Sequence, residues 1–360
     1  MTIACLNRVG TAVPDHDIHH GFVGYAQTLL SPRHAALYSR MAARSGIERR
    51  YSTLDLGDLV KGGGDAQGFY RPGAFPDTGA RMAVFEREAP PLAARAIAEL
   101  DTDLTRITHL IVASCTGFTA PGLDQHLVSR LGLRPDIQRT LVGFMGCSSA
   151  VPALRLAQQS VLADPTARVL VINLELCSLH LQETDDLETA LTFMLFGDGC
   201  AASLVSAQSE GLALGDFRSA TIPDTEALIT WHIGTQGFLM HLSGGVPGAI
   251  AQALRDERER GDAAGLLRGE GTQAIEAWAV HPGGRTVLDA VESGFALAPD
   301  SLAASRAVLA DHGNMSSATV MFVLKRLMHT SEQKLASGTR GMAMAFGPGM
   351  VAETFRFTAV

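Results

Sequence analysis

The fold is decided by the stretch Leu141-Val-Gly-Phe-Met-Gly-Cys147-Ser-Ser-Ala150-Val-Pro-Ala-Leu154, which joins an apolar run to a turn, a cysteine and a helix. The apolar run predicts a buried strand, and Gly146 allows a sharp turn behind it. Helical spacing continues to Val161, and Pro152 fits only the first turn of that helix. Cys147 is therefore predicted at a helix N-terminus, where free N–H groups and the macrodipole favour a thiolate. The alternative is a small cysteine that only packs in this junction.

Length and composition exclude several classes of protein. The chain has 360 residues, is 46% hydrophobic and has a net charge of −8, which argues against nucleic acid as the main partner. No apolar run approaches the roughly 20 residues of a membrane span, and the N-terminus has no secretory layout. Five cysteines without Cys-x-x-Cys pairs indicate a reducing compartment. We expect a cytoplasmic protein with no membrane span.

Strand-like and helical patterns alternate along the chain, which predicts an α/β fold with buried, largely parallel strands. The predicted strands are Thr108–Ala113, Val169–Leu174, Ala201–Val205, Ala277–Val280 and Gly341–Phe346, and the helices include Pro91–Leu100, Gly122–Leu131 and Val246–Arg258.

A weak internal sequence repeat suggests an ancient duplication. Cys147-Ser-Ser-Ala and Asn314-Met-Ser-Ser-Ala each open a helix after a glycine, and Phe196-Gly-Asp-Gly and Phe346-Gly-Pro-Gly each precede a strand. We therefore expect two related halves, residues 1–210 and 211–360, with a site between them.

Two further segments supply candidate catalytic groups. His281 ends an apolar strand at Val280-His281-Pro-Gly-Gly, where a side chain is held firmly but faces a cleft. Asn314 lies at the start of the second echoed helix. Alone, His281 could be a core histidine and Asn314 an ordinary N-cap. Together with Cys147 they can perform acyl transfer, because the thiolate takes an acyl group while imidazole and amide N–H groups stabilise an enolate oxygen.

Five motifs, in this order and spacing, resemble those of the type III polyketide synthases, the chalcone synthase-like family within the thiolase superfamily. They are Gly-Cys147-Ser-Ser-Ala, Leu195-Phe196-Gly-Asp-Gly, Val-His281-Pro-Gly-Gly, Gly-Asn314-Met-Ser-Ser-Ala and Phe346-Gly-Pro-Gly. The resemblance implies a thiolase-like layered αβαβα fold, a homodimer, and acyl-CoA and malonyl-CoA as substrates. It also implies that no metal, carrier protein or cofactor beyond the CoA thioesters is needed.

Residue by residue, the resemblance makes Cys147 the nucleophile and His281 and Asn314 the pair that promotes malonyl decarboxylation. Phe196 matches the aromatic gatekeeper between the CoA tunnel and the cavity. Met240 falls where plant enzymes have a second phenylalanine. The other residues assigned to the substrate cavity are Cys115, Thr116, Cys177, Trp231, Ser316, Phe346 and Gly347. Cysteines at often-threonine positions and Trp231 in place of a plant glycine look bacterial.

Arg40 and Arg44 resemble the family's CoA-phosphate segment. Four residues apart, they share one face if the segment is helical, as two phosphate contacts require. The alternative is a solvated helix face. Cys177 and His180 could suggest a metal pair, but two ligands without carboxylates in a ligand pattern make no site, so no metal is expected.

The sequence therefore predicts decarboxylative condensation of malonyl-CoA onto an acyl starter held on Cys147, then cyclisation. The flexible Met240 and a lining with few hydroxyls favour an aliphatic starter and an alkylpyrone or alkylresorcinol product, whereas the Trp231 indole would limit extension. The alternatives are a single condensation of the β-ketoacyl synthase III kind and a self-primed aromatic synthase using malonyl-CoA alone. A Cys-His-Asn hydrolase and an inactive acyl-CoA-binding scaffold are the remaining readings.

Overall fold

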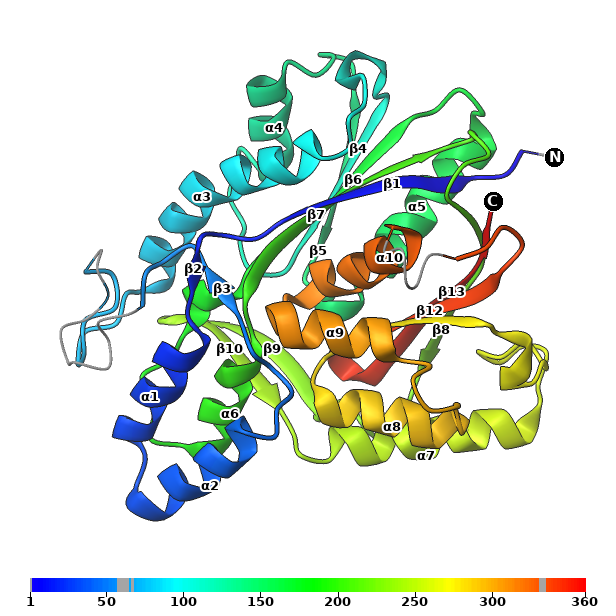
Figure 1. The fold of residues 1–360 in the computed structure, drawn as a ribbon. Coiled ribbons are helices and arrows are strands. Elements are labelled where there is room, and N and C mark those ends of the chain that lie inside the picture. Colours follow the sequence, from blue (N-terminus) through cyan, green and yellow to red (C-terminus); the bar gives the residue numbers. More distant parts are fainter. Residues whose placement is uncertain (1, 57–64, 66–67, 330–334) are drawn as a thin grey trace.

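The computed structural model describes residues 2–56, 65, 68–329 and 335–360 (Figure 1). Within this part of the chain a nine-stranded mixed sheet has the order β11-β12-β13-β8-β1-β7-β6-β4-β5. Its strands are β1 Cys5–Ala12, β4 His109–Ser114, β5 Gln138–Gly143, β6 Val169–Leu176, β7 Asp198–Ser206, β8 Leu212–Thr221, β11 Ala277–Val280, β12 Arg340–Gly347 and β13 Val351–Ala359. Two small hairpins complete the strands: β2 His16–Asp17 with β3 Tyr51–Ser52, and β9 Ile229–Gly234 with β10 Gly237–Leu242.

The large sheet consists of two parts that meet at a short seam. β1 and β8 are registered at only two residue pairs, Cys5 with Ala213 and Leu6 with Leu212. One part comes from the N-terminal half of the chain and the other from the C-terminal half. The prediction of largely parallel strands is wrong, because parallel pairing is confined to β4 with β5, β4 with β6, and β11 with β12. The remaining pairs of neighbouring strands in the large sheet are antiparallel, for example β6 with β7 and β12 with β13.

Helices and sheet parts alternate in five layers (Figure 1). The helices are α1 His19–Leu29, α2 Pro32–Ala42, α3 Thr78–Ala98, α4 Leu123–Leu131, α5 Ala150–Ala163, α6 Leu187–Leu195, α7 Val246–Arg260, α8 Arg285–Phe295, α9 Ala303–His312 and α10 Thr319–His329. α3 and α4 cover the outer face of the N-terminal part, while α7 and α8 cover the outer face of the C-terminal part. α5 and α10 share the core between the two parts. This is the αβαβα arrangement expected from the sequence.

β6 shows how the strand pattern specifies these layers. All eight of its residues are buried. Leu170, Ile172 and Leu174 belong to the outer core, whereas Val169 and Val171 belong to the central core around α5 and α10. Because successive side chains of a strand point to opposite faces, a continuous apolar run fits a sheet covered on both sides.

The expected strands and helices are all present, with one difference in environment. The strand before Cys147, β5, was expected to be buried, but five of its six residues are exposed. β5 is the last strand of the sheet, and the Leu141 side chain is 57% exposed. No helix within the described residues is long and apolar enough to cross a membrane.

Candidate active site

Cys147 lies on the strand–turn–helix elbow predicted from the sequence. Gly146 has a φ of +62°, and the residues Gly146–Ser148 form a short 3₁₀ turn that leads into α5. A Cβ on Gly146 would lie 2.3 Å from Pro348 Cδ. Glycine is therefore required both for the left-handed conformation and for the close approach of the 346–349 loop. The cysteine side chain is 8% exposed.

His281 and Asn314 reach the same place from the C-terminal half. His281 follows β11, and its backbone N–H donates to the Met344 carbonyl at 2.8 Å, which extends the parallel pairing with β12. The His281 side chain is 2% exposed, and neither ring nitrogen has a hydrogen-bond partner among the described residues. Such orphaned buried groups are uncommon and indicate a place for a ligand atom.

Asn314 makes a local hydrogen bond typical of a capping side chain and also faces the thiol of Cys147. Its Oδ1 accepts from the Ser316 N–H at 2.8 Å, as a capping side chain does. Its Nδ2 donates to the Gly283 carbonyl at 3.1 Å and lies 4.0 Å from Cys147 Sγ. One amide proton therefore remains available on the side of the thiol.

Backbone pairing joins the two halves at this site. The Asn314 N–H donates to the Leu195 carbonyl at 2.8 Å, and the Gly197 N–H donates to the Asn314 carbonyl at 3.0 Å. Phe196, between these two, forms an isolated parallel bridge with Asn314. The position of Phe196 is therefore fixed relative to Asn314, although 118 positions separate them in the sequence.

A narrow cavity of about 50 Å³ connects these groups. Cys147, His281 and Asn314 line it, and so do eight of the expected cavity residues: Cys115, Thr116, Cys177, Phe196, Trp231, Met240, Ser316 and Phe346. Gly347 is not in the lining. A Cβ there would lie 2.3 Å from Ser148 Oγ, so Gly347 lets the loop pack against the elbow and does not face substrate.

Burial changes the expected charge state of the site. It raises the pKa of Cys147 to about 11, although hydrogen bonding to Ser316 and Asn314 lowers that pKa in part. Burial also lowers the pKa of His281 to about 3. Burial therefore favours the neutral form of both groups and opposes the thiolate that the helix N-terminus is expected to favour. The cost of burying a charge exceeds the effect of the helix N-terminus.

Glu175 is a buried residue that the sequence analysis missed. It lies at the end of β6, is fully buried, and accepts hydrogen bonds from the Cys115 N–H at 2.9 Å, Thr116 Oγ1 at 2.8 Å and Ser317 Oγ at 2.5 Å. Burial raises its pKa. Glu175 thus holds the end of β4 and the Ser316–Ala318 turn on two sides of the cavity. In the sequence, the sign that could have identified Glu175 was a single glutamate within an apolar strand.

Trp231 lines the cavity, and His180 packs against it from behind, with the two ring centroids 5.9 Å apart. The Trp231 Nε1–H donates to the Cys115 carbonyl at 2.9 Å, so the indole is held in place across the cavity. His180 accepts from the Phe238 N–H at Nδ1 (3.0 Å) and donates from Nε2 to the Thr116 carbonyl (2.7 Å). Both ring nitrogens of His180 are therefore engaged, which leaves none to bind a metal beside Cys177.

Arg50 stabilises the backbone at Phe196 through hydrogen bonds. The guanidinium is 1% exposed, and its Nη1 donates to the carbonyls of Phe193 and Phe196 at the C-terminal end of α6. Burial lowers its pKa to about 10, so it stays charged at neutral pH. A cation at this helix end binds the last carbonyls and stabilises the turn that carries Phe196.

A larger outer cavity of about 650 Å³ leads to the narrow one, with which it shares Leu242, Val246, Gly283 and Val287. The first residues of α6, α7 and α8 line it, so three helix N-termini face it. Arg44 and Arg285 also line it, and Arg285 Nη1 donates to the Arg44 carbonyl at 3.2 Å. N-termini and arginines together favour an anion, whereas Asp186 and Glu188 at the start of α6, which also line this cavity, oppose one.

The expected pairing of Arg40 with Arg44 is wrong. α2 ends at Ala42, so Arg44 lies in the turn beyond the helix and the two arginines do not share a helical face. Arg40 is exposed and does not line the outer cavity. Arg285, which the sequence analysis missed, lies there in its place; the Gly-Gly-Arg that follows His281 was the available signal.

Comparisons with known proteins match the whole chain. Residues 3–209 match the family described as chalcone and stilbene synthases, N-terminal domain, and residues 216–360 match its C-terminal domain. The alpha-pyrone synthesis polyketide synthase-like protein Pks18 of Mycobacterium tuberculosis is 32% identical over 100% of this chain and 92% of its own. The bisdemethoxycurcumin synthase of Oryza sativa subsp. japonica is 38% identical over 88% of this chain and 81% of its own. The crystal structure of PKS-I from the brown alga Ectocarpus siliculosus superposes with a TM-score of 0.86 at 31% identity, covering 100% and 99% of the two chains.

Proposed function

Since the chain belongs to the chalcone and stilbene synthase family, the type III polyketide synthases, we propose that Cys147, His281 and Asn314 are its catalytic residues. The observation that supports this most strongly is the convergence of one thiol, the unpartnered ring nitrogens of His281 and an amide N–H of Asn314 directed at the thiol in one apolar cavity. Such donors act strongly where water is excluded, because little else competes for their hydrogen bonds.

Starter loading follows from the neutral state of the free site. Cys147 Sγ attacks the thioester carbonyl of an acyl-CoA, and the S–CoA bond breaks. The thiol proton passes to His281 and then to the departing CoA sulfur, so the site returns to its uncharged state. The low pKa of His281 makes its protonated form short-lived, which suits a group that must release the proton at once.

Extension of the acyl chain uses the two hydrogen-bond donors, the His281 ring N–H and the Asn314 amide N–H. Malonyl-CoA binds with its thioester oxygen toward the His281 ring N–H and Asn314 Nδ2–H, and the carbon–carbon bond to its carboxylate breaks to release CO₂. The electron pair forms an enolate, whose oxygen the donors stabilise. The enolate carbon attacks the acyl carbonyl on Cys147, a carbon–carbon bond forms, and the sulfur leaves as a thiolate. The thiolate takes up one proton from the solvent, which balances the negative charge of the carboxylate lost as CO₂.

The substrates are CoA thioesters that enter through the outer cavity, where Arg44, Arg285 and three helix N-termini bind phosphate groups. No further cofactor takes part in these steps. We propose an aliphatic starter and an alkylpyrone or alkylresorcinol product, since Met240 and the apolar lining suit a hydrocarbon chain and one relative is named for alpha-pyrone synthesis.

We also propose that residues 1–210 and 211–360 act as two halves of one enzyme. The family models divide between residues 209 and 216, and Cys147 and Phe196 come from the first half while His281 and Asn314 come from the second. A cytoplasmic location fits the five free cysteines, and a homodimer fits the exposed edge strand β5.

The decisive variant is Asn314→Ala. Loss of one such donor typically lowers the rate by about 100- to 1000-fold, so CO₂ release from malonyl-CoA falls by that factor while mass spectrometry still detects an acyl group on Cys147. Cys115→Ala is the matched control, because it removes a thiol from the same cavity and leaves loading in place. Unchanged decarboxylation in Asn314→Ala, or an adduct on Cys115 or Cys177 in the unaltered protein, contradicts the proposal.

A further inference from the structure

A third cavity lies on the far side of Phe346. It has a volume of about 800 Å³ and is bounded by the end of β8, the turn that follows it and α7. Among the described residues, Phe346 is the one that lines both this cleft and the narrow cavity at Cys147. Its side chain is 5% exposed and pairs across the sheet with Ala352, which also lines the cleft.

The narrow cavity is too small for the chain that the proposed reaction builds. About 10–15 Å³, by the same measure, holds one water molecule, so 50 Å³ holds roughly four groups of that size. A medium or long acyl chain on Cys147 exceeds this. Trp231 is hydrogen-bonded across one wall and Phe196 is fixed by Arg50 on another. The Phe346 wall, by contrast, has the cleft of about 800 Å³ behind it.

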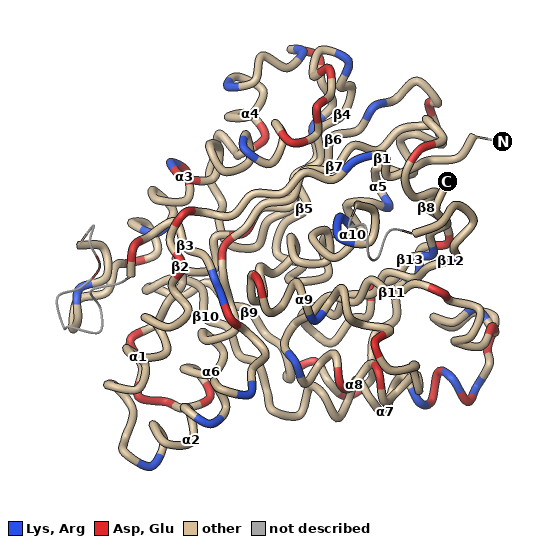
Figure 2. Tube along the Cα trace, viewed as in Figure 1, with Lys and Arg blue, Asp and Glu red and all other residues tan. Residues whose placement is uncertain are grey.

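The lining of the cleft indicates what it accepts. Its inner part is apolar and includes Ile222, Ala249, Ala253 and Leu254. Its rim carries Asp256 and Glu259 against Arg260, on the half of α7 where acidic and basic residues alternate (Figure 2). Glu257 also lines the cleft but is buried, and it accepts a hydrogen bond from the Leu267 N–H. A predominantly acidic rim disfavours CoA phosphates and free carboxylates but not a neutral hydrocarbon. The outer cavity, by comparison, carries Arg44 and Arg285 beside Asp186 and Glu188.

We propose that the cleft between α7 and β8 receives the distal end of the acyl chain bound to Cys147, and that Phe346 is the specificity-determining residue that separates the two spaces. The Phe346 side chain changes its rotamer to admit a long acyl chain and keeps its position when the acyl chain is short. This inference rests on the proposed function, because it requires an acyl group on Cys147.

Photoaffinity labelling tests the path directly. The protein is loaded with tetradecanoyl-CoA that carries a diazirine at its terminal carbon, without malonyl-CoA, and is irradiated and digested. We expect label on peptides that contain residues 220–225 or 249–260. Label confined to residues 229–242 or 187–196 overturns the inference, and absence of any acyl group on Cys147 overturns the proposed function instead.

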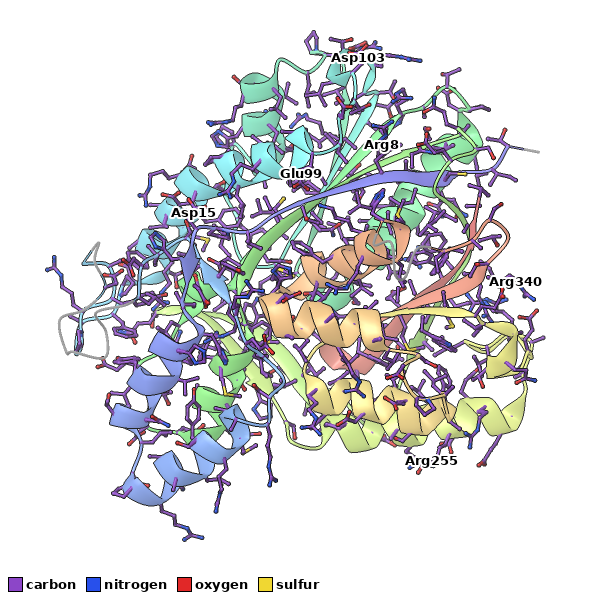
Figure 3. All side chains as sticks on the ribbon, in the orientation of Figure 1. Arg8, Asp15, Glu99, Asp103, Arg255 and Arg340 are labelled. Atoms are coloured by element: carbon purple, nitrogen blue, oxygen red, sulfur yellow. The ribbon has the colours of Figure 1, made fainter. Side chains whose placement is uncertain are left out.

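Chain-length kinetics provide a second, independent measurement: the ratio of kcat/KM for tetradecanoyl-CoA to that for hexanoyl-CoA. Phe346→Ala should raise this ratio by about four-fold for each additional methylene that becomes buried, and Ala253→Phe, which fills the cleft, should lower it at least ten-fold. Arg255→Phe is the matched control, since it adds the same side chain to α7 where Arg255 points outward (Figure 3). An unchanged ratio in both cleft variants, or an equal fall in Arg255→Phe, contradicts the inference.

Discussion

At the scale of single residues, the chemistry of Cys147 is governed by desolvation. A thiol at a helix N-terminus is normally acidic, yet here burial raises its pKa to about 11. A raised pKa favours the protonated form below that pH, so at pH 8 about one part in a thousand is thiolate. On the proposed function, the thiolate would therefore form when substrate is bound, and we expect slow alkylation of Cys147 in the free protein.

Alkylation kinetics check this charge state. We expect the rate at which iodoacetamide labels Cys147 to rise about ten-fold with each pH unit between pH 7 and pH 10, followed by mass spectrometry of the peptide. Cys147→Ser gives the background from the other four buried cysteines. A rate that is flat from pH 6 to pH 9 would show a preformed thiolate–imidazolium pair.

At the scale of elements, the sequence predicted the elbow and the strand that delivers His281, because local rules fix both. A glycine with positive φ, a proline in the first helical turn and a strand that stops at Pro-Gly-Gly all act within a few residues. The predictions failed where distant parts of the chain decide. α2 ends two residues before Arg44, and β5 is last in the sheet, so its apolar residues are exposed. Neither fact is encoded in hydrophobic periodicity.

The exposure of β5 leads to a prediction about assembly. An exposed edge strand with apolar side chains is a ready site for pairing with another chain, and Leu141 and Met145 are 57% and 38% exposed. We expect a dimer in sedimentation velocity experiments that Leu141→Lys converts to monomer. Leu162→Lys is the matched control, because Leu162 is a 48% exposed leucine on α5. A dimer that survives Leu141→Lys places the interface elsewhere.

At the scale of the whole molecule, the five layers place the two elbows, one from each half, at the centre, and they place three helix N-termini around one outer cavity. The repeated motifs predicted the two elbows, since a repeat of two helix starts indicates two related layers, but not the helix N-termini around the outer cavity. The cavity volumes could not be predicted from the sequence, because a volume depends on how side chains from both halves pack against one another. Trp231 illustrates this, as its indole is positioned by a carbonyl 116 positions away.

The overall charge of the molecule sets the last prediction. A net charge of −8 disfavours the approach of CoA phosphates, and on the proposed function Arg44 and Arg285, which line the outer cavity, offset this repulsion. Changing both to alanine takes the charge from −8 to −10 and should raise KM for malonyl-CoA by about ten-fold at low salt with kcat unchanged. Salt should raise KM in the unaltered protein and have less effect in the double variant, because salt screens the attraction that the variant has already lost.

Arg40→Ala is the control for charge alone, since it removes one cation outside the cavity. If Arg40→Ala raised KM as much as Arg44→Ala, general repulsion rather than local phosphate binding would be responsible.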